Sequence, residues 1–137
     1  MKPIKFIFIG EIQMKRVILA VFLVTLTAGA NAGCIRANMA GKWQTFIAEA
    51  GWGWSSCKIS VGGSGKVTGG SCKDNLGTAA ITGGQLTVNA ACEVSGNLYV
   101  DGTLNRVTIA RLSLDRSTLM GVVTIQGDST TFSAMRY

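Results

Sequence analysis

Hydrophobic and polar residues alternate with a period of two along much of this chain, and the stretch from residue 85 to residue 100 shows the pattern best. Most of its odd positions are polar, while its even positions include Leu86, Val88, Ala90, Cys92, Val94, Leu98 and Val100. Successive side chains of an extended strand point to opposite faces, so this period predicts half-buried β-strands. Glycine-rich turns separate the alternating stretches, and the chain has 18 glycines. The pattern therefore predicts an all-β domain.

Nine stretches carry the alternation or a related strand pattern. We expect strands over residues 43–49, 53–61, 66–73, 78–82, 85–91, 93–100, 106–114, 118–126 and 130–136, of which 78–82 has the weakest pattern. Ala110, Leu112 and Leu114 would share one face, and one helical turn is expected within 37–40.

Short strands joined by short turns favour an antiparallel up-and-down meander that closes into a small barrel of about eight strands. A β-sandwich is one alternative. A short β-helix is another, because the segments 67–70, 81–84 and 94–96 are similar to one another and nearly evenly spaced.

The two ends of the domain indicate how the sheet closes. Gly41-Lys42-Trp43 opens the first strand, and Arg136 nearly ends the last. If these strands pair antiparallel, Trp43 lies beside Arg136, and the guanidinium can cover the indole. Closure would also remove two exposed sheet edges, which are prone to aggregation.

Gly41, Trp43, Arg136 and the number of strands resemble the calycins, the lipocalin and avidin type of small up-and-down barrel. Members of this group have a Gly-x-Trp at the start of the first strand, and in lipocalins an Arg from the end of the barrel packs on that Trp. The resemblance implies a calycin-like barrel that holds a small hydrophobic molecule.

Residues 1–32 are expected to form a secretory signal peptide. A basic start at 14–16 precedes an apolar run at 17–26, and small residues typical of a signal-peptidase cleavage site follow at 30–32. A transmembrane anchor is the rival interpretation, but the apolar run is about half as long as a membrane span. Residues 1–13 would be an over-long start if translation begins at Met14.

Residues 33–137 are then a single exported domain, in the periplasm or outside the cell. A lipid anchor at Cys34 is less favoured, because Asn31 stands where a lipidation signal has an apolar residue.

All four cysteines lie in the exported part, and an even number in a small exported domain predicts two disulfides. A turn centred between residues 64 and 65 would place Cys57 opposite Cys72, which leaves Cys34 to pair with Cys92. This register needs a glycine bulge at the turn to bring Val67 to the inner face. Pairing Cys72 with Cys92 and Cys34 with Cys57 is the alternative.

Composition excludes several kinds of chemistry. The chain has no His, so a Ser-His-Asp or Cys-His arrangement is impossible, and neither a metal site nor a cofactor site is expected. Distant acids such as Glu49 and Asp101 could meet only through folding. Residues 33–137 have nine basic and six acidic residues, and this net charge of +3 is mild and scattered, which argues against a nucleic-acid partner. We therefore expect a protein that is not an enzyme.

Trp52 and Trp54 are two residues apart between glycines, so in an extended segment both indoles would point to one side. They could form a stacking platform, with Trp43 as a third candidate ligand-binding residue, or they could close one end of the core.

The sequence thus predicts a non-enzymatic binding protein of the bacterial envelope, holding a small apolar or glycan ligand near these aromatic residues. One alternative is a protein-interaction module, such as a hydrolase inhibitor or a surface or host-interaction factor. Another is a structural envelope component that assembles through an open sheet edge. A hollow barrel would favour ligand binding, and a filled one would favour the other two roles.

Overall fold

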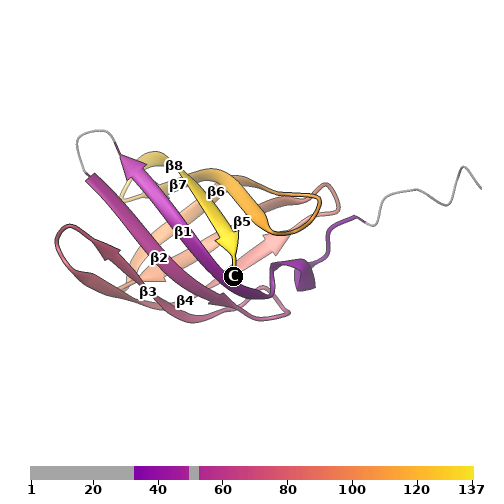
Figure 1. The fold of residues 1–137 in the computed structure, drawn as a ribbon, viewed down its shortest axis with the longest axis horizontal. Coiled ribbons are helices and arrows are strands. Elements are labelled where there is room, and N and C mark those ends of the chain that lie inside the picture. The colour runs from indigo at the N-terminus through magenta and orange to yellow at the C-terminus, as the bar shows by residue number, and fades with distance from the viewer. Residues whose placement is uncertain (1–32, 50–52) are drawn as a thin grey trace, which may run out of the picture. The chain divides into compact units, whose positions relative to one another are not determined.

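A computed structural model describes residues 33–49 and 53–137 (Figure 1). The expected signal peptide and Trp52 lie outside the described residues. The described elements are η1 (Arg36–Met39), β1 (Gly41–Glu49), β2 (Gly53–Val61), β3 (Val67–Asp74), β4 (Thr78–Val88), β5 (Glu93–Val100), β6 (Thr103–Leu112), β7 (Thr118–Ile125) and β8 (Asp128–Arg136).

The strands form a closed antiparallel barrel in chain order from β1 to β8. This confirms the predicted meander and excludes both the sandwich and the β-helix. Closure occurs between β1 and β8, which run side by side in Figure 1, and their register places Trp43 directly opposite Arg136 as predicted. The expected strands 78–82 and 85–91 are a single strand, β4, in which the pairing with β5 shifts between Ile81 and Gly83.

The near-repeat in the sequence marks irregularities of the sheet. Register shifts occur beside its second and third copies, between Ile81 and Gly83 and between Val94 and Gly96. A Cβ atom on Gly96 would lie 2.1 Å from the carbonyl oxygen of Gln85, so only glycine permits this close approach of β4 and β5. The copies therefore contain glycines at which the backbones of neighbouring strands come close together.

Both predicted disulfides are present. Cys57 and Cys72 face each other across β2 and β3, and the register of this pair shifts between Ser60 and Val61, so that Val61 pairs with Val67. This shift is the bulge that the sequence required. The bond between Cys34 and Cys92 ties the segment before η1 to the turn between β4 and β5.

The inner face of the barrel holds the core, as the alternation predicted. Ala110, Leu112, Leu119, Val123, Phe132 and Ala134 are among its buried residues. The expectation for Leu114 was wrong, because β6 ends at Leu112 and Leu114 is 94% exposed. Asp115 holds a turn here by accepting hydrogen bonds from the hydroxyls of Ser113 and Ser117, and this turn carries Leu114 away from the sheet.

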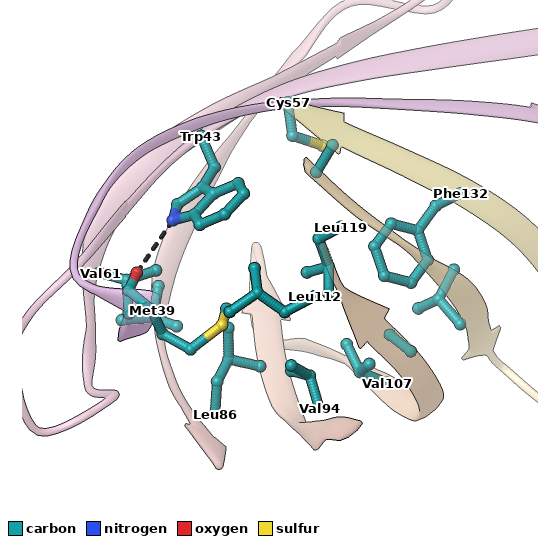
Figure 2. Close-up of a cluster of buried hydrophobic side chains, with 14 of the residues drawn as sticks. Met39, Trp43, Cys57, Val61, Leu86, Val94, Val107, Leu112, Leu119 and Phe132 are labelled. Atoms are coloured by element: carbon teal, nitrogen blue, oxygen red, sulfur yellow. Dashed lines mark hydrogen bonds between the residues drawn. The ribbon is translucent and has the colours of Figure 1, made fainter. Parts of the chain in front are cut away.

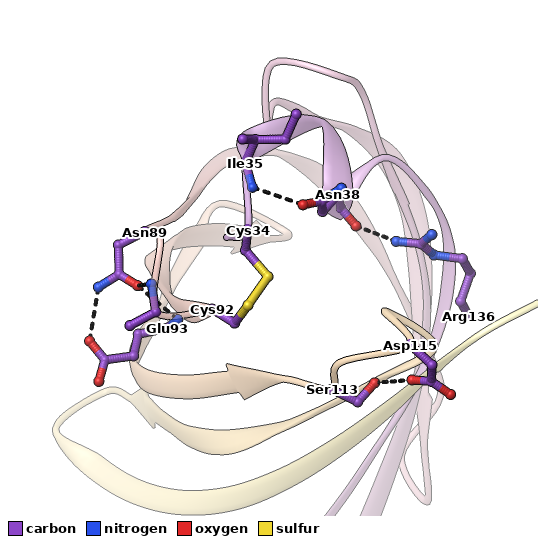
Figure 3. The surroundings of a disulfide bond; sticks show 10 residues. Cys34, Ile35, Asn38, Asn89, Cys92, Glu93, Ser113, Asp115 and Arg136 are labelled. Atoms are coloured by element: carbon purple, nitrogen blue, oxygen red, sulfur yellow. Dashed lines mark hydrogen bonds between the residues drawn. A yellow bond between two sulfur atoms is a disulfide. The ribbon is translucent and has the colours of Figure 1, made fainter. Parts of the chain in front are cut away.

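The short helix η1 closes one end of the barrel, and the chain ends beside it (Figures 1 and 3). The side chain of Met39 is only 1% exposed and belongs to the core. The expected helical turn is thus confirmed as a 3-10 helix. Because β1 begins at this closed end, the loops after β3, β5 and β7 lie at the opposite end, which we call the mouth.

Candidate functional site

The barrel is hollow. A cavity of about 340 Å³ lies inside it, and inward-facing residues of all eight strands line it. Most of the lining is apolar, and Figure 2 shows side chains such as Trp43, Leu86, Val94, Val107 and Phe132 pointing toward a common interior. A cavity of this volume is at the small end of the range of ligand-binding pockets.

Small inward-facing residues explain why the barrel is not filled. Thr45, Cys57, Cys72, Ala79 and Ala134 all line the cavity. They lie on β1, β2, β3, β4 and β8, so the short side chains are concentrated on one side of the wall. A barrel of eight strands can be filled by its own side chains, but only where those side chains are large enough to meet.

The closed end is held by contacts around Trp43. Its indole Nε1 donates a hydrogen bond of 2.9 Å to the carbonyl oxygen of Met39. The guanidinium carbon of Arg136 lies 4.7 Å from the centre of the indole ring, and Arg136 also donates to the carbonyl oxygen of Asn38 (Figure 3). The predicted contact between Trp43 and Arg136 is confirmed, and it anchors η1 over the barrel.

The mouth is polar. Ser55, Asp74, Asp101, Thr103 and Asn105 line the cavity there, and they lie at or just beyond the mouth ends of β2, β3, β5 and β6. Hydrogen bonds hold the side chains of Asp74, Asp101 and Asn105 in place.

The two aspartates are fixed by backbone donors. The Oδ1 atom of Asp74 accepts hydrogen bonds from the backbone N–H groups of Leu76 at 2.7 Å and Gly77 at 2.9 Å. The Oδ1 atom of Asp101 accepts one from Ala80 at 2.9 Å. Each carboxylate is therefore oriented by the loop or strand beside it.

Two of the candidate tryptophans, Trp43 and Trp54, lie on opposite faces of the barrel wall. Trp43 is 2% exposed and lines the cavity, whereas Trp54 is 51% exposed. On β2 the inward positions are Ser55 and Cys57, so Trp54 points to the outer face of the wall. The ligand-binding role of Trp54, like that of Trp52, stays a prediction.

Sequence reasoning missed most of the mouth. Asp74 follows the inward-facing Cys72 by two residues, which is a signal that it too points inward. Asp101 was noticed only as an acid that folding could bring to Glu49, whose side chain is not described. For Asn105 the signal was its two-residue spacing to Val107, another inward position of β6.

Two further observations bear on the chemistry of the described residues. They contain no group of three or more potential metal ligands. The pKa of Asp115 is lowered to about 2, chiefly by hydrogen bonds from the hydroxyls of Ser113 and Ser117, but this residue lies in a turn at the closed end.

Within the described part of the chain, no helix is long and apolar enough to cross a membrane.

These features define a closed eight-stranded antiparallel β-barrel that is cross-linked by two disulfides and has an apolar cavity and a polar mouth. The architecture is compatible with the small barrels of the calycin type. No protein-family model, curated protein or solved structure matches the chain.

Proposed function

We propose that this protein binds a small, largely apolar molecule inside the barrel, as a non-enzymatic binding protein. The observation that carries the proposal is the cavity of about 340 Å³ with its apolar lining. Protein interiors are normally packed with few voids larger than a water molecule. An unfilled apolar space of this size forfeits many dispersion contacts, and an apolar ligand would restore them.

The form of the cavity also supports binding. Trp43, Met39 and Arg136 close one end, while polar residues surround the other. A molecule that enters from the mouth would leave water along its whole length, and burial of apolar surface contributes roughly 25 cal/mol per Å². This arrangement favours the apolar ligand over the glycan, which would need more polar partners along the cavity wall.

Binding can be tested with N-phenyl-1-naphthylamine, an uncharged dye whose fluorescence rises in apolar surroundings. We expect the oxidised protein to bind it with a stoichiometry of about one, as a single cavity of this size requires. Ala134→Leu, which narrows the cavity, should weaken binding at least about tenfold. Met135→Leu is the matched control, because Met135 is 53% exposed on the outer face of the same strand.

Dye binding that Ala134→Leu leaves unchanged would refute the proposal, because the dye would then sit on the outside of the barrel. Absence of binding by the dye and by simple aliphatic compounds would also refute it.

An outer apolar surface favours a second candidate function, a contact with another protein. Phe46 on β1 and Met120 on β7 each lie opposite Ser133 on β8, and Met135 follows two residues later on the same face. Phe46, Met120 and Met135 are 47%, 66% and 53% exposed. Met120→Lys should abolish capture of a partner from the protein's own compartment. Capture that survives this substitution would refute the second candidate.

The third role, assembly through an open sheet edge, gains no support, because β1 pairs with β8 and the described sheet has no free edge.

A further inference from the structure

The two carboxylates at the mouth keep acceptor capacity that faces the cavity. Within the described residues, hydrogen bonds reach only the Oδ1 atoms of Asp74 and Asp101. The ion pair found in the described part of the chain joins Arg111 to Glu93 and involves neither of them. An ionised carboxylate only accepts hydrogen bonds, through about four lone-pair sites, so each retains an unused oxygen beside the cavity.

Asn105 adds an independent observation. Its side chain lines the cavity and is only 7% exposed. The amide nitrogen donates a hydrogen bond of 3.1 Å to the carbonyl oxygen of Thr103, which leaves Oδ1 as the free end of the group. No donor from the described residues reaches this oxygen, and it is not among their fully buried polar atoms, so it is open to a group that occupies the cavity. This oxygen can accept a hydrogen bond from a donor on the ligand.

Charge is unevenly distributed between the two ends of the barrel. At the mouth, Asp74, Asp101 and Asp128 lie at strand ends, while Lys73 and Arg106 are exposed on the outside of the wall. The closed end carries the bases Arg36, Lys42, Lys66, Arg111, Arg116 and Arg136 against the acids Glu93 and Asp115. Acids around an opening with low-dielectric walls focus the field and attract cations.

We propose that the ligand is a cationic amphiphile, an apolar body with a protonated amine at one end; this inference rests on the proposed function. The apolar body occupies the cavity and the ammonium group remains at the mouth. There its N–H groups donate to Asp74, Asp101 and the Oδ1 atom of Asn105. Charge-assisted hydrogen bonds of this kind are roughly twice as strong as neutral ones. A carboxylate in the same place would meet the like charges of Asp74 and Asp101.

The inference is tested with three probes that share one chain and differ in the head group: decylamine, decanol and decanoate. Each displaces N-phenyl-1-naphthylamine from the oxidised full-length protein near pH 7 in low salt, where the amine is protonated. We expect decylamine to bind about ten to a hundred times more tightly than decanol, as hydrogen bonds to a charged group imply, and decanoate to bind most weakly.

The double variant Asp74→Asn/Asp101→Asn tests which residues provide the preference. Asparagine retains the oxygen that accepts the backbone hydrogen bonds, and it tolerates the positive φ of 46° at Asp101, so the fold should persist. Circular dichroism and binding of decanol check this. Asp128→Asn is the control, because it removes the same charge at the same end from a residue outside the cavity lining.

Loss of the amine preference in the double variant, with decanol binding unchanged and Asp128→Asn close to the parent, would support the inference. Equal binding of all three probes to the parent would overturn the inference and leave the proposed function standing. Failure of all three probes and the dye to bind would overturn both. A preference that survives in the folded double variant would overturn the assignment to these aspartates.

Discussion

Replacing Arg136 tests whether the contact with Trp43 holds the closed end together. In Arg136→Met, the side-chain stem still covers the indole, but the charge and the hydrogen bond to Asn38 are lost. The guanidinium lies 4.7 Å from the ring centre, and such a contact contributes about 1–2 kcal/mol where it is shielded from water. The lost hydrogen bond to Asn38 costs about 1.5–3 kcal/mol, since a charged donor makes it.

One change in the free energy of unfolding partly offsets these losses. The Nε atom of Arg136 is buried and has no partner among the described residues, and removing such a group returns about 1–3 kcal/mol. The net expectation is a loss of about 2 kcal/mol in the free energy of unfolding. Arg136→Lys should lose less, because an ammonium can still lie over the ring while the planar fork is missing.

Urea unfolding with both disulfides intact, followed by tryptophan fluorescence, measures this difference. Urea is preferred to guanidinium chloride, since a salt screens charges. Arg106→Met is the control, because Arg106 is exposed on the outer wall, and it should change stability by less than about 0.5 kcal/mol. If Arg136→Met unfolds at the same urea concentration as the parent, the contact does not stabilise the barrel and the reasoning fails.

Two further predictions concern stability. The pKa of Asp115 is lowered from its ordinary value of 3.8 to about 2 in the folded protein, so the contribution of this carboxylate to stability is present above about pH 4 and is lost as the pH falls toward 2. Asp115→Asn should flatten the dependence of urea unfolding on pH in this window, and an unchanged slope would contradict the assignment. The two disulfides close loops of 58 and 15 residues, so replacing Cys34 and Cys92 by serine should cost about 4 kcal/mol and replacing Cys57 and Cys72 about 3 kcal/mol. Thermal unfolding of the two double variants gives the order, and a reversed order would show that strain or residual structure outweighs loop entropy.

Much of the fold could be predicted because its determinants are local. The alternation from Leu86 to Val100 sets which face is buried, and the glycine-rich turn after Val61 sets the register that brings Cys57 to Cys72. The exposure of Leu114 could not be predicted in this way. Its spacing from Leu112 continues the pattern, but the hydrogen bonds of Asp115 end the strand first.

The cavity depends on residues that no single strand contains. Thr45 and Ala134 are small, and each would be compatible with a filled barrel if a large side chain faced it from across the interior. The sequence of one strand does not show which residues it will face, since this follows only from closure and register. The mouth was missed for a similar reason, because Asp74 ends β3 and Asp101 follows β5, so both resemble ordinary turn residues.

If the proposed function is right, the closed end of the barrel provides stability and the mouth provides the contacts to the ligand. The disulfide of Cys34, the contact of Trp43 with Arg136 and the buried Met39 all act at the closed end, where they tie the short helix to the barrel. At the mouth, Asn105 and the two aspartates keep unused acceptors. Binding residues commonly lie in the less stable regions and on the loops of a rigid scaffold. A polar atom that is free to bind a ligand is one that makes no hydrogen bond of its own within the fold. Changes at Arg136 should therefore lower stability while leaving the preference for the amine head group intact. The variant Asp74→Asn/Asp101→Asn should lose that preference while keeping its stability.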